Sequence, residues 1–209
     1  MSAPRPARRP ANGRPVPAVA VASLYERNLV TRETGRAVRG GIERLFAGRC
    51  GESVAVLDFG AVAVIDFSCA DEVVAKLVLQ ADAPGGDEEV RFVLVRGVQD
   101  HHLDPVECAL RRRGLAVAAE RATGEPVLLG EADAAAAAAF EALCRCGRTS
   151  TEELAGRLGL GEEDCGRLLA ELHRRRLCRR CDDGWESLLV TASAAGEARP
   201  ARVAPPAGE

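Results

Sequence analysis

Aromatic residues are scarce in this chain of 209 residues: one Trp, one Tyr and five Phe make up 3% of it. So few rings argue against a surface that stacks bases or sugars. No glycine-rich loop is followed by the lysine of a phosphate-binding loop. Long apolar runs are also missing, because the uncharged stretch 15–25 is far shorter than the roughly 20 residues that a membrane span needs. The sequence therefore predicts neither a nucleotide-phosphate loop nor a membrane segment.

What is present favours a globular protein. Apolar residues make up 47% of the chain and charged residues 28%, which is enough for a buried core in one domain and a small second one. The net charge of −3 argues against a globally basic nucleic-acid binder. Eight cysteines occur without a convincing export signal, so we expect a cytoplasmic protein with reduced thiols or metal ligands.

The chain divides into four segments by composition. Residues 1–15 are rich in Arg and Pro and predict a disordered basic leader, and 193–209 predict a disordered tail. Segment 16–130 alternates expected helices and strands, which predicts an α/β domain with a mostly parallel sheet. Its helices are expected at 31–47, 69–80 and 105–113, and its strands at 53–59, 90–96 and 115–119. Asp104 is expected to cap the helix at 105–113, with His101 and His102 in a solvated loop before it.

Segment 131–192 has a different pattern. Asp133 is expected to cap a helix, and Ser150 with Glu153 forms a capping box for the next one. A third helix and a hairpin around the turn 182–184 follow, so the order predicts a winged helix-turn-helix domain. Its apolar positions are spaced as in the core of such a domain: Leu154, Ala155, Leu158, Leu160, Leu168, Leu169 and Leu172.

Three blocks of the first domain carry a family resemblance. They are TRETGR at 31–36, LDF at 57–59 and IDFSCADEVVAKL at 65–77, and the similarity continues through 101–120. In this order they resemble the bacterial STAS-like family, which is related to the STAS domain of anti-sigma-factor antagonists. The resemblance implies an α/β STAS-like fold and a protein partner, with a histidine-kinase-like ATPase as the kind of partner.

The resemblance also implies a partner-docking and phosphorylation site at Asp66, Ser68, Cys69 and Asp71. In antagonists the motif is Asp-Ser-Ser/Thr-Gly-Leu and the first Ser is phosphorylated. Aligning Asp66 places Phe67 at the acceptor position, Ser68 one place later and Cys69 at the Gly. Two readings of Ser68 stay open: phosphorylation at a helix N-terminus, or a structural N-cap paired with Asp71. For Cys69 the alternatives are a thiolate stabilised by the helix dipole and a small buried side chain.

The second domain is similar to bacterial winged-helix regulators in the stretches TEELAGRLGL and LLAELHRRRL. Arginines near its third helix and first hairpin strand are the candidates for DNA contact: Arg167, Arg174, Arg175, Arg176, Arg179 and Arg180. The third helix opens on three carboxylates, Glu162 to Asp164, which repel phosphate at the turn where bases are normally read. DNA binding and protein docking or dimerisation therefore both stay open.

Four clustered cysteines, Cys144, Cys146, Cys178 and Cys181, predict either a zinc site or unpaired thiols.

No arrangement of side chains points to catalysis, and no cofactor is expected. The leading hypothesis is a non-catalytic bacterial signalling protein in which a STAS-like domain is coupled to a DNA-binding winged helix for transcription regulation. The alternative is a partner-switching or scaffold protein whose winged helix mediates protein docking or homodimerisation and binds no DNA. A zinc or thiol-redox sensor is the third hypothesis.

Overall fold

The computed structural model describes residues 18–20, 27–46, 54–82 and 92–190. The expected leader 1–15, the tail 193–209 and Cys50 lie outside these ranges. Within them the chain forms an α/β structure with mixed parallel and antiparallel strands. No helix in the described ranges has the length and apolar character to cross a membrane.

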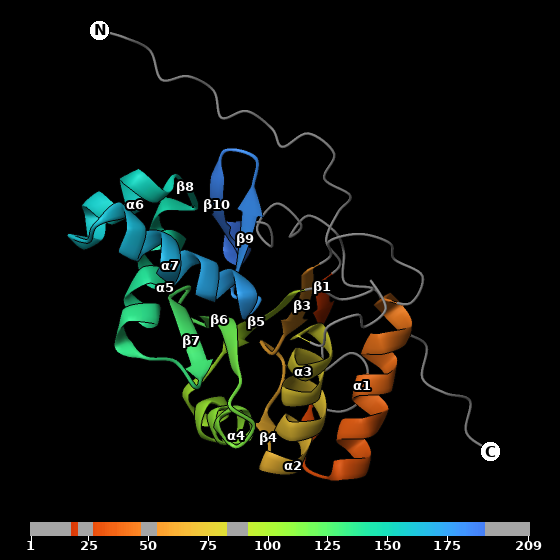
Figure 1. Ribbon diagram of the computed structural model, residues 1–209. Coiled ribbons are helices and arrows are strands. Elements are labelled where there is room, and N and C mark those ends of the chain that lie inside the picture. Colours follow the sequence, from red (N-terminus) through yellow and green to blue (C-terminus); the bar gives the residue numbers. More distant parts are fainter. Residues whose placement is uncertain (1–17, 21–26, 47–53, 83–91, 191–209) are drawn as a thin grey trace, which may run out of the picture.

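A five-stranded sheet forms the centre of the molecule (Figure 1). Its strands, in spatial order, are β1 (Ala18–Ala20), β3 (Val54–Asp58), β5 (Phe92–Val98), β6 (Ala116–Arg121) and β7 (Pro126–Gly130). The first four run parallel, and β7 pairs antiparallel with β6. The expectation of a mostly parallel sheet is confirmed, whereas β1 and the edge strand β7 were not expected.

One face of this sheet is covered by the helices of the first half of the chain. They are α1 (Arg32–Phe46), α2 (Phe67–Ala70), a π-helical turn η2 (Asp71–Ala75), α3 (Lys76–Asp82) and α4 (Asp100–Arg111). A short parallel pair, β2 (Asn28–Leu29) with β4 (Val64–Ile65), lies beside them. Apolar residues at helical spacing, such as Val38, Ile42, Val73 and Leu77, are buried against the sheet, as their periodicity predicts.

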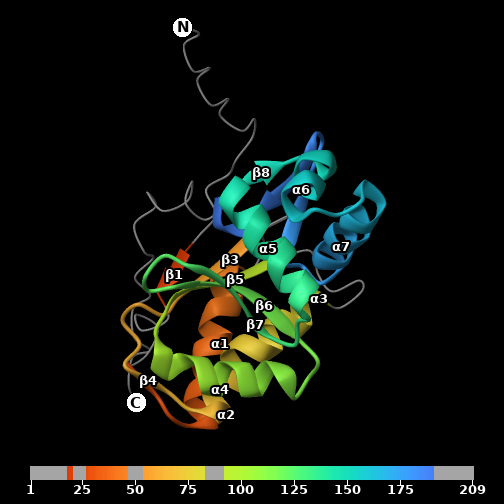
Figure 2. The same cartoon turned by 90° about the vertical axis from the view of Figure 1, so that its left-hand side faces the viewer.

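The second half of the chain covers the opposite face of the sheet (Figure 2). It contains α5 (Ala134–Cys146), β8 (Arg148–Thr149), α6 (Thr151–Leu158), α7 (Glu162–Arg174), β9 (Cys178–Cys181) and β10 (Gly184–Ser187). The three strands form an antiparallel sheet in the order β8-β10-β9. The predicted caps are confirmed at Asp133 and at the capping box of Ser150 and Glu153. The prediction for Leu160 was wrong, since this side chain is 40% exposed beyond the end of α6.

The central sheet joins the two halves because its side chains alternate between two apolar cores. In β3, Ala55 and Leu57 pack with the first group of helices, whereas Val54 and Val56 pack with the second. The strands β5 and β6 alternate in the same way. On the second face these strand residues share one buried cluster with Phe140 of α5. The helices α5 to α7 are therefore packed on the sheet rather than tethered to it by a linker.

The start of α4 corrects the sequence prediction. The helix begins at Asp100, its N-cap is Gln99, and Pro105 lies inside it. Asp104 is therefore not the cap, and His102 is fully buried in the first turn instead of lying in a solvated loop. The reason is a local pair of hydrogen bonds: the backbone N–H of His102 donates to the carbonyl oxygen of Gln99 at 2.9 Å, and the Nδ1 of His102 accepts from the N–H of Gln99 at 3.2 Å.

Candidate functional site

The first and third sequence blocks meet where α1 crosses α2 and η2. Gly35 of α1 makes this approach possible. A Cβ on Gly35 would lie 2.8 Å from the Cβ of Glu72 and 3.1 Å from the Cα of Cys69, closer than side chains pack. Glycine at this position therefore brings the α1 backbone directly against the π-helical turn. This contact assembles the candidate site from TRETGR and IDFSCADEVVAKL.

Two carboxylates are buried at this crossing. The π-helical turn presents Asp71 and Glu72 inward, with 5% and 0% of their surface exposed, although their neighbours Val73 and Val74 belong to the apolar core. A π-helical turn inserted between α-helical segments is frequent at functional sites. Burying an ionised carboxylate is costly unless it is paired, so the partners of these two groups define the site.

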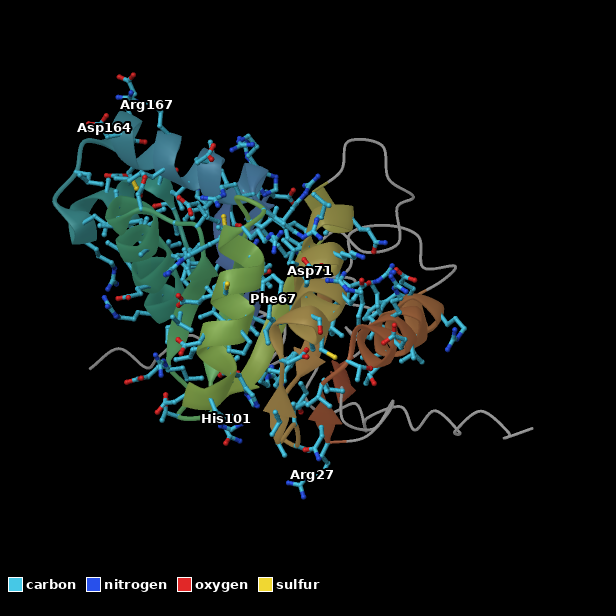
Figure 3. All side chains as sticks on the ribbon, turned by 90° about the horizontal axis from the view of Figure 1, so that it is seen from below. Arg27, Phe67, Asp71, His101, Asp164 and Arg167 are labelled. Carbon is cyan, nitrogen blue, oxygen red and sulfur yellow. The ribbon has the colours of Figure 1, made fainter. Side chains whose placement is uncertain are left out.

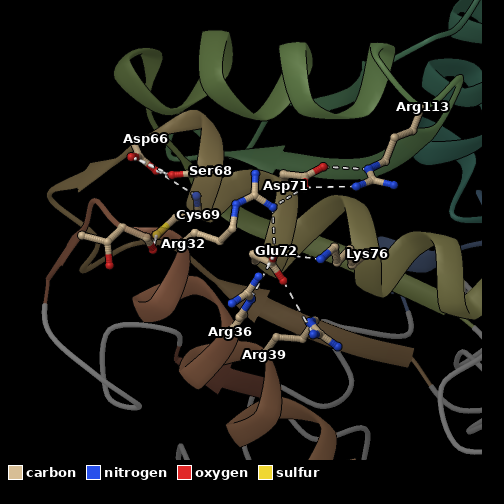
Figure 4. Close-up of polar contacts among 11 residues, drawn as sticks. Arg32, Arg36, Arg39, Asp66, Ser68, Cys69, Asp71, Glu72, Lys76 and Arg113 are labelled. Carbon is tan, nitrogen blue, oxygen red and sulfur yellow. Dashed lines mark hydrogen bonds and ion pairs between the residues drawn. The ribbon is translucent and has the colours of Figure 1, made fainter.

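Glu72 is surrounded by cations from two helices (Figure 4). Lys76 Nζ lies 2.7 Å and Arg32 Nη1 3.0 Å from Glu72 Oε1, and Arg36 Nε lies 3.6 Å from the same oxygen. Arg39 Nη2 lies 3.6 Å from Oε2. Burial acts to raise the pKa of Glu72, but the hydrogen bond and charge of Lys76, together with the arginines, hold that pKa below its usual value. Glu72 is therefore ionised at neutral pH.

Asp71 binds a cation from the turn that follows α4. Arg113, just after α4, donates from Nε to Asp71 Oδ1 at 2.6 Å and from Nη2 to Oδ2 at 3.0 Å, a two-bond fork. Arg32 Nη1 lies 3.5 Å from Oδ2 and so links the two carboxylates. The hydrogen bond from Arg113 is the main cause that lowers the pKa of Asp71, against the opposing effect of burial. The cluster thus ties α1, η2, α3 and the end of α4 together.

The neighbouring helix start also corrects the sequence prediction. The N-cap of α2 is Asp66, whose Oδ1 accepts from the backbone N–H of Cys69 at 2.8 Å. Ser68 is not the cap; its hydroxyl lies 3.0 Å from both oxygens of Asp66 and donates to that carboxylate. Asp71 does not pair with Ser68, since it is occupied by arginines. A carboxylate competes well for a helix N-terminus because it is fully charged, which explains why Asp66 takes this position.

Cys69 is a buried thiol rather than a stabilised thiolate. Its Sγ donates to the carbonyl oxygen of Thr31 at 2.8 Å. Burial, with the adjacent charge of Asp66, raises the pKa of Cys69 to about 11, despite its place in the first turn of a helix. The thiol is therefore protonated at neutral pH, which argues against the redox reading of this residue.

The six arginines proposed for DNA contact are mostly engaged within the protein. Arg167 pairs with Asp164, Arg174 with Glu171 and Arg179 with Glu186, so three of them lie against carboxylates. The other three contact the protein differently: Arg175 donates to the carbonyl of Glu131, Arg176 lies over the ring of Phe92, and Arg180 lies over the ring of Trp185. Figure 3 shows Asp164 and Arg167 side by side at the outer end of α7, far from Asp71.

Two of the four clustered cysteines make hydrogen-bond contacts with groups of the protein. In the described part of the chain, no three His, Cys, Asp or Glu side chains gather in a way that holds a metal ion. Cys144 Sγ lies 3.2 Å from the hydroxyl of Ser187, and the buried Cys178 points its thiol to the carbonyl of Leu169 at 3.8 Å. Burial raises the pKa of Cys144 to about 11 and that of Cys178 to about 12. Cys178 is a buried thiol and Cys144 a half-buried one, and both are protonated at neutral pH.

The sequence reasoning missed the residues that make the ion cluster. Glu72 and Lys76 fall in the helix expected at 69–80 and Arg113 in the helix expected at 105–113, and none of the three was a candidate site residue. One signal was available: Arg32, Arg36 and Arg39 recur at spacings of four and three and so lie on one face of α1. Their counterparts Asp71 and Glu72 lie up to 40 residues away, and no local pattern reveals that pairing.

A scan against protein-family models finds no match for this chain, and a search of curated proteins finds none either. The interpretation of the site therefore depends on its geometry. That geometry offers charged and hydrogen-bonding groups at a helix crossing.

Proposed function

We propose that this chain is a non-catalytic regulatory protein, with a STAS-like domain that docks a protein partner and a winged helix packed on the same sheet. The observation that carries the proposal is the meeting of the first and third sequence blocks in one ion-paired site at the crossing of α1 with α2 and η2. The element order from α5 to β10 supports the winged-helix interpretation.

The docking surface of this proposal includes Asp66 and Ser68 at the start of α2. Both side chains are half-buried, and the double contact between them fixes their positions. A fixed polar surface loses little conformational entropy when a partner binds. The proposed partner is a histidine-kinase-like ATPase, as the family resemblance implies, and Ser68 is its candidate phosphorylation site.

The test is capture of purified histidine-kinase-like ATPases from the same genome by the full chain. We expect Ser68→Asp to weaken capture about tenfold, equivalent to about 1.4 kcal/mol, because the new carboxylate repels Asp66 and disturbs the start of α2. Thr123→Asp, in the exposed turn after β6, is the matched control and should leave capture unchanged. Equal capture by the wild type and both variants would contradict docking at this surface.

For the winged helix we propose protein docking rather than DNA binding. The outer turn of α7 carries Glu162, Glu163 and Asp164, and all three are exposed. Two exposed arginines further along α7, Arg167 and Arg174, already pair with carboxylates of the same helix. Such a face presents excess negative charge to the phosphates of a duplex, which opposes association.

DNA binding is the second candidate, and one observation favours it. The side chains of Arg167 and Arg174 are 71% and 68% exposed, so each can exchange its carboxylate for a phosphate. Titration of a labelled duplex from the gene's own promoter decides between the two. The docking proposal predicts only weak binding that is equal for unrelated duplexes. Tight binding to the promoter that is lost in Arg167→Ala and falls steeply with salt would establish the DNA candidate instead.

A further inference from the structure

We propose that the cations above Asp71 and Glu72 form a docking surface for an acidic segment of a partner protein. We call this surface the basic face; it consists of Arg32, Arg36, Arg39, Lys76 and Arg113. The inference rests on the proposed docking role of the STAS-like domain, because it names the chemistry of the partner.

The basic face has its negative charge underneath and its positive charge outside. The side chains of Glu72 and Asp71 are 0% and 6% exposed, whereas those of the five cations are between 22% and 58% exposed. Five cations stand against Asp71, Glu72 and the Glu43 carboxylate that pairs with Arg39, so an excess of two positive charges faces solvent. Arg36 is the most exposed of them and has the loosest contact, at 3.6 Å from Glu72.

The buried carboxylates orient this face. A buried ion pair contributes little net stability compared with apolar residues of the same size, because the desolvation cost offsets the attraction. What the two carboxylates do provide is fixed positions for long, flexible side chains. Each guanidinium carries five N–H donors, and contacts to Glu72 and Asp71 use only some of those of Arg32, Arg36 and Arg113. Arginines held in this way bind an incoming carboxylate with a smaller loss of entropy.

The surroundings favour a short acidic peptide over a nucleic acid. Glu43 pairs with Arg39 and with Gln80 at one end of the crossing, and Asp66 lies at the start of α2 at the other end. A duplex carries one negative charge about every 1.7 Å along its axis, so a bound duplex would also meet these carboxylates. A peptide with two or three acidic residues fits between them. Its carboxylates also match the fork geometry of arginine.

The experiment measures binding of a fluorescein-labelled peptide with three consecutive glutamates to the full chain by fluorescence anisotropy at neutral pH. We expect saturable binding that weakens with added salt. Arg36→Gln should weaken binding several-fold, and the double variant Arg32→Gln/Arg36→Gln at least tenfold. Arg157→Gln is the matched control because Arg157 is an exposed arginine on α6 and the charge change is identical. Urea midpoints of the variants verify that each remains folded.

Three results would overturn the inference. The first is equal peptide affinity in Arg36→Gln, the double variant and Arg157→Gln. The second is displacement of the peptide by an oligonucleotide of equal charge at a lower concentration, which would assign the face to nucleic acid. The third is peptide binding that requires a second copy of the chain, seen as a dimer in sedimentation. Absence of ATPase capture by the wild-type chain, with peptide binding intact, would contradict the proposed kinase partner but not the basic face.

Discussion

Phe140→Ala is expected to lower the free energy of unfolding by about 3–5 kcal/mol, the usual cost of removing a buried phenyl ring. Phe140 lies on α5 and is fully buried. It shares one cluster with residues of the central sheet, such as Phe92 and Leu94, and with residues of α7, such as Leu169. Its loss leaves a cavity between the sheet and the second half of the chain. Urea unfolding followed by circular dichroism measures the change.

The same experiment tests whether the two halves unfold together. Because β3, β5 and β6 supply side chains to both cores, we expect one transition in the wild type and in the variant. Leu160→Ala is the control, since Leu160 is 40% exposed and its truncation should cost less than 1 kcal/mol. A loss below about 1.5 kcal/mol for Phe140→Ala, or a separate early transition, would show that α5 is not anchored on the sheet.

His102 is expected to make the protein less stable as the pH falls from about 6.5 to 4. Its Nδ1 accepts from the N–H of Gln99 at 3.2 Å, and its Nε2 lies 3.1 Å from the carbonyl oxygen of Val62, to which it donates. These contacts require the neutral ring. Burial, and then the charge of His101, lower the pKa of His102 to about 4 from an ordinary value of 6.5.

The sign follows from proton binding in the two states. Between pH 4 and 6.5 the unfolded chain is protonated at His102 and the folded chain is not, so acid favours unfolding. The contribution is complete above pH 6.5 and is lost as the pH falls to about 4. Its size is on the order of 3 kcal/mol at 1.36 kcal/mol per pKa unit. The paired carboxylates Asp71 and Glu72, whose pKa values are lowered, begin to lose their contribution only as the pH falls below their ordinary values of 3.8 and 4.5.

Urea midpoints measured across this range for the wild type and His102→Gln provide the test. The variant should be less stable near pH 7 but should depend less on pH between 6.5 and 4. His101→Gln keeps the buried ring and should retain most of the wild-type dependence, since His101 itself is exposed. A wild-type slope that persists in His102→Gln would assign the effect to other groups.

Periodicity and capping patterns located most of the secondary structure. The expected helix at 31–47 is observed as α1, Arg32–Phe46, and the expected strand at 53–59 as β3, Val54–Asp58. These predictions succeed because they depend on the fit of apolar residues at spacings of 3.6 or 2 to one buried face. The caps at Asp133 and Ser150 were found for a similar reason, since a cap bonds to backbone only three residues away.

The predictions failed where a distant group decided the outcome. Asp71 was expected to act locally with Ser68, but Arg113 binds it from 42 residues away. Asp104 before Pro105 had the pattern of a helix start. The helix instead begins at Asp100, and its first turn places the buried His102 in contact with the carbonyl oxygen of Val62. The sequence did not predict which elements cover the second face of the sheet. The apolar runs in β3 and β5 show only that both faces are buried.

The scarcity of aromatic rings and long apolar runs, the apolar periodicities and the caps determined that this chain forms an α/β structure followed by three helices and a hairpin. These features act within a few residues, so the sequence alone specifies them. Only the tertiary structure decided that Gly35 brings α1 against a π-helical turn, that five cations cover Asp71 and Glu72, and that α5 packs on the sheet. Ion pairs and shared cores join residues that are distant in the chain, and their partners are set by the packing of whole elements.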